Sequence, residues 1–144
     1  MPPKSTPFSM RLSPLVDALV TDEARRIKRS KGAVVEALAD EAIRMRLFPG
    51  VAFQGQDWDR RPWVIGTGFD VWQMIEAYRD FGSVEALVSA GFNLEARHVE
   101  LALAYYERFP DEIDEAIASN RRPLSELRTE FPFIAVIGDE PDAP

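Results

Sequence analysis

The sequence predicts a mainly α-helical chain that begins with one short strand and carries a small β-hairpin near its middle. Three observations support this fold class. Residues 8–12 alternate apolar and polar side chains, the period of a strand with one apolar face. Residues 14–47 contain two runs with apolar side chains at helical spacing. Residues 70–120 repeat this spacing between residues that typically start and stop helices.

The first helix is predicted to begin at Pro14, with Ser13 as its N-cap. Proline suits the first helical position, and a serine hydroxyl accepts a hydrogen bond from a free amide there. Ser30 is the equivalent cap of a second helix that runs to about Leu47. Since Lys28 stands where a glycine commonly closes the first helix, we expect a non-glycine residue to take that turn.

The short strand has unpaired backbone groups on both edges, and two helices alone do not cover it. A second copy of the same strand is the simplest partner. Two copies then pair antiparallel across a two-fold axis, and four helices close over the apolar face of the ribbon. Ser9 and Arg11 from each chain lie on the outward face, which is narrow enough to enter the major groove of DNA.

This stretch resembles the ribbon-helix-helix family of DNA-binding dimers. The matching pieces are the strand ending Met10-Arg11-Leu12-Ser13 and the helix opener Ser30-Lys31-Gly32-Ala33-Val34-Val35. The resemblance implies an intertwined homodimer over residues 8–48 that binds operator DNA. The predicted DNA-binding residues are Ser9, Arg11, Ser13, Ser30 and Lys31. Arg11 is expected to contact bases, and Ser30 and Lys31 to contact phosphate.

The charge is distributed unevenly along the chain, whose net charge is −7. Residues 1–48 contain nine Lys/Arg and six Asp/Glu, a balance of +3, and residues 49–144 contain eight and eighteen, a balance of −10. Such asymmetry suggests that one end of the chain binds nucleic acid and that the other end has a different role. For the acidic half, an equal alternative is that its charge only aids solubility. Five cations surround the predicted start of the second helix, where phosphate is attracted: Arg25, Arg26, Lys28, Arg29 and Lys31.

The second half of the chain is predicted to hold a hairpin followed by helices. The expected elements are short strands at 51–53 and 63–65, a helix from Asp70 through Arg79, a short helix from Ser83 to about Ala90, a helix over 94–108 capped by Asn93, and a helix from Pro110 to about Asn120.

This half resembles the small tri-helical, winged-helix-like domain of VapB-like antitoxins, which commonly occur beside PIN-like toxins. The resemblance covers residues 49–120. Its motifs are Pro49-Gly50-Val51, Arg60-Arg61, Gly66-Thr67-Gly68, Asp70-Val71-Trp72 and Val99-Glu100-Leu101-Ala102-Leu103-Ala104-Tyr105-Tyr106. It implies an antitoxin of a type II toxin-antitoxin system that neutralises a PIN-like ribonuclease and represses its own transcription.

The ends of the chain are expected to lie outside both domains. Residues 1–7 are proline-rich and predicted to be a flexible arm. Residues 121–144 form a tail with an apolar run, which is either packed on its own domain or reserved for a partner. The candidate toxin-binding residues of this tail are Arg121, Arg122, Arg128, Phe131, Phe133 and Ile134.

Composition argues against an enzyme. The chain has no cysteine and one histidine, His98, which excludes thiol nucleophiles, histidine triads and multi-histidine metal sites. We interpret His98 as a surface or half-buried helical residue and the carboxylates at 111–115 as a solvated helix face. We therefore predict no cofactor and no metal. With no apolar run long enough for a bilayer and no visible secretory signal, we expect a cytoplasmic protein without a membrane partner.

Two other functions fit the same sequence. In the first, the N-terminal domain serves dimerisation alone, and the protein is an adaptor that sequesters a partner without binding DNA. In the second, the protein is a ribbon-helix-helix regulator that has no toxin. Operator binding separates the first alternative from the antitoxin prediction, and a neighbouring PIN-like gene separates the second.

Overall fold

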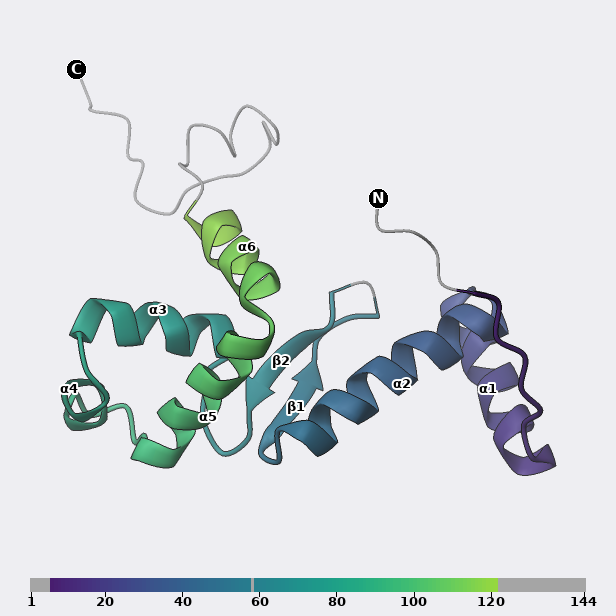
Figure 1. The fold of residues 1–144 in the computed structure, drawn as a ribbon, viewed down its shortest axis with the longest axis horizontal. Coiled ribbons are helices and arrows are strands. Elements are labelled where there is room, and N and C mark those ends of the chain that lie inside the picture. Colours follow the sequence, from purple (N-terminus) through teal and green to yellow (C-terminus); the bar gives the residue numbers. More distant parts are fainter. Residues whose placement is uncertain (1–5, 58, 122–144) are drawn as a thin grey trace, which may run out of the picture. The chain divides into compact units, whose positions relative to one another are not determined.

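A computed structural model describes residues 6–57 and 59–121 of the chain (Figure 1). The described part is mainly helical with a small two-stranded antiparallel sheet, which confirms the predicted fold class at this level. The chain divides into two compact units, one ending at Pro62 and one starting at Trp63. The elements are α1 (Pro14–Ile27), α2 (Lys31–Leu47), β1 (Val51–Gln54), β2 (Arg61–Val64), α3 (Val71–Phe81), α4 (Val84–Ser89), α5 (Ala96–Arg108) and α6 (Pro110–Asn120).

The predicted capping residues begin both N-terminal helices. The Ser13 hydroxyl accepts a hydrogen bond from the Val16 amide at 3.4 Å, and the Ser30 hydroxyl accepts one from the Ala33 amide at 3.1 Å. Lys28 has the left-handed conformation, with φ 56° and ψ 46°, and so takes the turn that glycine usually occupies. These three predictions are confirmed.

Residues 6–13 belong to no helix or strand of the single chain. A strand is defined by hydrogen bonds to a neighbouring strand, and the expected neighbour is a second copy of this segment. The ribbon therefore stays a prediction.

The first unit has a small core. Its cluster of buried residues between the helices consists of Val20, Ala24 and Val34, and the half-buried side chains packed against them are Leu12, Ile27 and Val35. These residues join the inner faces of α1 and α2, the two helices that pack together in this unit.

The hairpin follows α2 as predicted, and β1 packs against that helix. Gly50 has φ 106° in the break that ends α2, a conformation that favours glycine. Gly55 has φ 112° at the end of β1, where a Cβ atom would lie 2.1 Å from the Asp59 carbonyl oxygen. A side chain at this position would collide with backbone, so the turn requires glycine.

The second unit is built from α3, α4, α5 and α6, with α3 in contact with each of the other three. Asp70 begins α3 as predicted, in a capping box with Gln73, whose Oε1 accepts from the Asp70 amide at 2.9 Å. Ser83 caps α4 as predicted, since its hydroxyl accepts from the Ala86 amide at 3.1 Å. The buried apolar side chains of this unit are Val64, Val71, Met74, Ile75, Leu87, Leu94, Val99, Ala102, Tyr105, Ile113 and Ile117.

Two details of α5 differ from the prediction. Asn93 is not the N-cap: it has φ 58°, a left-handed conformation that asparagine tolerates, and α5 begins after Glu95. His98 is 6 % exposed rather than a surface or half-buried residue. Its Nδ1 accepts a hydrogen bond from the Glu95 amide at 3.0 Å, so the imidazole satisfies one of the free amides at the helix start.

Only some of the apolar side chains of α5 are buried. Val99, Ala102 and Tyr105 are buried, whereas Leu101 is half-buried and Ala104 is exposed. In addition, none of the helices in the described residues is long and apolar enough to cross a membrane.

Candidate nucleic-acid interface and its anchors

All five predicted DNA-binding side chains belong to the first unit and are exposed. Ser9 and Arg11 lie in the segment before α1, and Ser13 and Ser30 are helix caps. A capping hydroxyl accepts the amide hydrogen bond through its oxygen and keeps its own proton. Ser13 and Ser30 therefore retain a donor for a phosphate oxygen.

Lys31 differs from the other four because its ammonium forms an ion pair with Asp17 of α1 at 2.5 Å. Both side chains are about half exposed, at 52 % for Lys31 and 48 % for Asp17. Exposed ion pairs contribute little, typically 0–1 kcal/mol. A phosphate therefore competes with Asp17 for Lys31 at small energetic cost.

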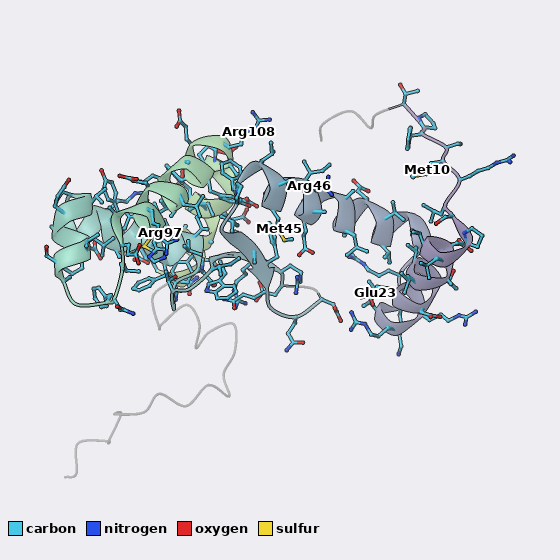
Figure 2. The ribbon with its side chains drawn as sticks, turned by 90° about the horizontal axis from the view of Figure 1, so that it is seen from below. Met10, Glu23, Met45, Arg46, Arg97 and Arg108 are labelled. Carbon is cyan, nitrogen blue, oxygen red and sulfur yellow. The ribbon has the colours of Figure 1, made fainter. Side chains whose placement is uncertain are left out.

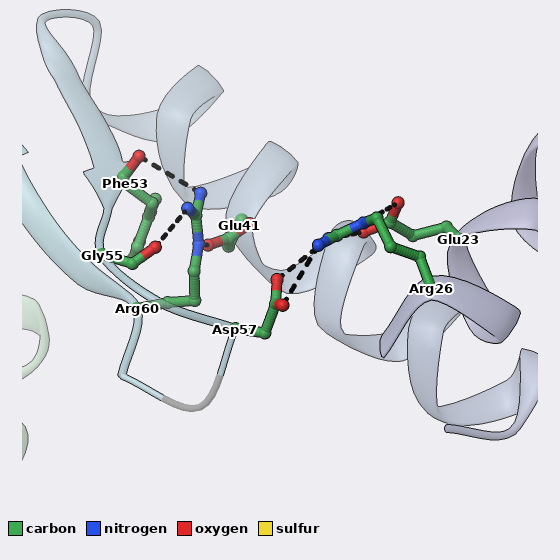
Figure 3. A network of polar contacts seen from close by, with 7 residues as sticks. All are labelled: Glu23, Arg26, Glu41, Phe53, Gly55, Asp57 and Arg60. Carbon is green, nitrogen blue, oxygen red and sulfur yellow. Dashed lines mark hydrogen bonds and ion pairs between the residues drawn. The ribbon is translucent and has the colours of Figure 1, made fainter. Parts of the chain in front are cut away.

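Arg26 of the basic cluster is engaged by two carboxylates (Figure 3). Its Nη1 and Nη2 donate to the two Asp57 oxygens at 3.1 Å and 2.9 Å, and its Nε donates to Glu23 Oε2 at 3.0 Å. These hydrogen bonds lower the pKa of both carboxyls below their usual values and raise the pKa of the guanidinium. Arg26 thus links α1 to the loop after β1 and is the cluster member least available to phosphate.

Arg60 anchors the same loop from its other side (Figure 3). Its Nε donates to Glu41 of α2 at 2.7 Å, and its two Nη atoms donate to the carbonyls of Gly55 at 3.3 Å and Phe53 at 3.2 Å. Within this loop Arg61 forms an ion pair with Asp59 at 2.7 Å, whereas Asp57 and Arg60 pair with helices distant in sequence.

Three cations of the cluster remain available. The side chains of Arg25, Lys28 and Arg29 are exposed and have no hydrogen bond or ion pair within residues 6–57 and 59–121. They lie at the end of α1 and in the turn that leads to α2. Because a helix N-terminus attracts anions, this turn is suited to contact a phosphate backbone.

The second unit has a polar network of a different kind. Arg79 of α3 donates to the Tyr106 hydroxyl at 2.9 Å and to Asp114 Oδ1 at 3.1 Å, and the Tyr106 hydroxyl donates to the same carboxylate at 2.9 Å. The hydrogen bond to Asp114 raises the pKa of Tyr106, and Arg79 lowers that of Asp114. The network joins α3, α5 and α6 at the surface.

Arg121 is the one candidate toxin-binding residue that lies within the described part of the chain. Its Nε donates to Glu76 Oε1 at 2.8 Å, which ties the end of α6 to α3. The other candidates, Arg122, Arg128, Phe131, Phe133 and Ile134, lie outside the described residues.

Comparison of the chain with protein families, curated proteins and solved structures gave no match.

Arg26→Gln is expected to raise the pKa of both Asp57 and Glu23 toward their usual values. Because the pKa values of these two carboxyls are lowered in the native protein, their hydrogen bonds to Arg26 contribute to the free energy of unfolding. That contribution is fully present above the unfolded-state pKa and disappears as the pH falls through the native pKa values. Carboxyl titration by NMR measures the change. Arg25→Gln removes an unpaired neighbour and is the control; equal shifts in both variants would contradict the assignment.

Proposed function

We propose that this protein is an antitoxin-type repressor that binds operator DNA as a homodimer and neutralises a PIN-like ribonuclease toxin. The observation that supports this proposal most directly is the exposed apolar surface of the first unit. Among its described residues this unit buries four side chains of the hydrophobic core, Val20, Ala24, Val34 and Val51. It exposes nine large apolar side chains: Phe8, Met10, Leu15, Val16, Leu19, Leu38, Ile43, Met45 and Leu47. Met10 and Met45 are labelled in Figure 2.

The exposed side chains follow helical faces. Leu15 and Leu19 are one turn apart on α1 and are 72 % and 60 % exposed. Leu38 and Met45 are two turns apart on α2. Burying one such side chain contributes about 1.5–3 kcal/mol. A surface of this kind favours association, and a second copy supplies an apolar surface of matching pattern.

The same association places the polar side chains on the outside. Residues alternate between the two faces of a strand, so covering Phe8 and Met10 leaves Ser9 and Arg11 facing outward. Arginine binds guanine through two hydrogen bonds in the major groove. The free cations Arg25, Lys28 and Arg29 and the proton of Ser30 then serve the phosphate backbone.

The toxin-binding half of the proposal rests on the charge of the second unit. Residues 63–121 contain four Lys/Arg and eleven Asp/Glu, so their balance is 4 − 11 = −7. This charge disfavours contact with DNA and suits a protein partner. The resemblance to VapB-like antitoxins supplies the class of partner, and the apolar tail after Arg121 supplies a segment to bind it.

Arg11→Ala is expected to abolish specific operator binding and to leave the fold intact, because Arg11 is exposed. Each lost bidentate base contact costs about 1–3 kcal/mol, roughly 5- to 150-fold in affinity. The measurement is binding of the purified protein to its own upstream DNA over a salt series, where wild-type affinity should fall steeply with salt. Arg97→Ala removes an exposed arginine of the second unit and is the control.

Normal operator binding by Arg11→Ala would show that the segment is not the base-contacting element. If the wild-type protein fails to bind at low salt, the adaptor function replaces the repressor function.

Ending the chain at Asn120 is expected to weaken binding to the product of a neighbouring PIN-like gene while operator binding persists. The truncation removes the whole tail and spares every residue of the DNA-binding unit. Calorimetric titration of toxin into both proteins measures the difference. Equal toxin affinity in the two proteins would exclude the tail as the toxin-binding segment.

A further inference from the structure

Three carboxylates engage the basic cluster around the start of α2 in the described part of the chain. Asp17 pairs with Lys31, and both Glu23 and Asp57 pair with Arg26. Asp17 and Glu23 belong to α1, so that helix fixes their positions. Asp57 is the exception, because it lies in the loop between β1 and β2, 31 residues from Arg26 along the chain. Its contact with the cluster therefore depends on where the hairpin lies.

The Asp57 carboxylate occupies the part of Arg26 that would bind an anion. Its Oδ2 accepts a hydrogen bond from Nη1 at 3.1 Å, and its Oδ1 accepts one from Nη2 at 2.9 Å (Figure 3). A guanidinium binds phosphate through two such parallel hydrogen bonds. With the contacts to Glu23, four of the five N–H groups of Arg26 are used within the chain. Asp57 and a phosphate therefore compete for the same donors.

The contact between Asp57 and Arg26 can break without loss of the fold. The Arg26 side chain is 57 % exposed and that of Asp57 is 43 % exposed, and ion pairs so open to solvent contribute little to stability. The hairpin also has a second anchor. Arg60 donates to Glu41 of α2 at 2.7 Å and to two backbone carbonyls of the hairpin. The hairpin therefore stays attached to α2 when Asp57 releases Arg26.

We propose that Asp57 restrains DNA binding by holding Arg26 away from the phosphate backbone. The inference rests on the proposed function and adds a contact through which the hairpin regulates DNA affinity. Glu23 contacts only Nε and Nη2, so release by Asp57 frees both N–H groups of Nη1. Each chain then presents Arg26 to DNA in addition to the cations at the turn before α2.

Asp57→Asn in the full-length protein tests this restraint, and Asp59→Asn is its matched control. Both substitutions remove one negative charge from the same loop and break an exposed ion pair, but Asp59 pairs with Arg61 instead of the cluster. The measurement is binding to the protein's own upstream DNA over a salt series. Asp57→Asn should tighten binding about 2- to 5-fold relative to Asp59→Asn. It should also steepen the slope of log affinity against log salt by about 0.9 for each phosphate gained.

The same two substitutions in an Arg26→Gln background show whether the effect acts through Arg26. In that background they should change DNA affinity equally, because there is no guanidinium left to release. A difference that persists there would overturn the proposal, as would equal gains from the two substitutions in the wild-type background. Unchanged amide shifts in α1 and α2 verify that each variant is folded.

Failure of the restraint is distinguishable from failure of the proposed function. If the wild-type protein binds no DNA at low salt, both are overturned. If the wild-type protein binds its operator and Arg11→Ala does not, the proposed function holds, and the substitutions at Asp57 and Asp59 decide the restraint alone.

Discussion

The first unit is limited by how little apolar surface one chain can bury. Val20, Ala24 and Val34 form the buried cluster between α1 and α2, and they are small. Most large apolar side chains of the unit, including Leu15 and Leu19, remain in contact with water. Since conformational entropy opposes folding by about 1–2 kcal/mol per residue, so small a core is a weak basis for an independent domain. The proposed association with a second copy would resolve this shortage and at the same time set which residues face outward.

The polar contacts of the same unit divide its cations by role. Arg26 and Arg60 are held in place because their guanidinium groups donate hydrogen bonds to carboxylates and carbonyl oxygens. At the turn before α2, the side chains of Arg25, Lys28 and Arg29 have no ion pair with any other described residue. The left-handed conformation of Lys28 makes that turn tight and brings the end of α1 close to the start of α2. A basic cluster that looks uniform in sequence is therefore part scaffold and part available surface.

Local chemistry made much of this fold predictable. Ser13, Ser30 and Asp70 cap helices because their side chains satisfy amides a few residues away, and sequence shows such neighbours directly. Predictions failed where the partner is set by tertiary packing. For this reason the sequence did not predict that Arg26 pairs with Asp57 or that Arg60 pairs with Glu41. Likewise, the positions of Ser9 and Arg11 on an exposed segment agree with the proposed interface, but strand pairing between chains is not a property of one chain.

The central claim is that a second copy covers the apolar face of the first unit, and the mass of the full-length protein in solution tests it most directly. The chain mass is 16.3 kDa, and sedimentation equilibrium should give twice that value at micromolar concentration. Leu19→Asp, which places a charge on the exposed face of α1, should shift the protein toward the single-chain mass, whereas Ile65→Asp, at a similarly exposed position of the second unit, should not. A mass of one chain at every concentration would contradict the account.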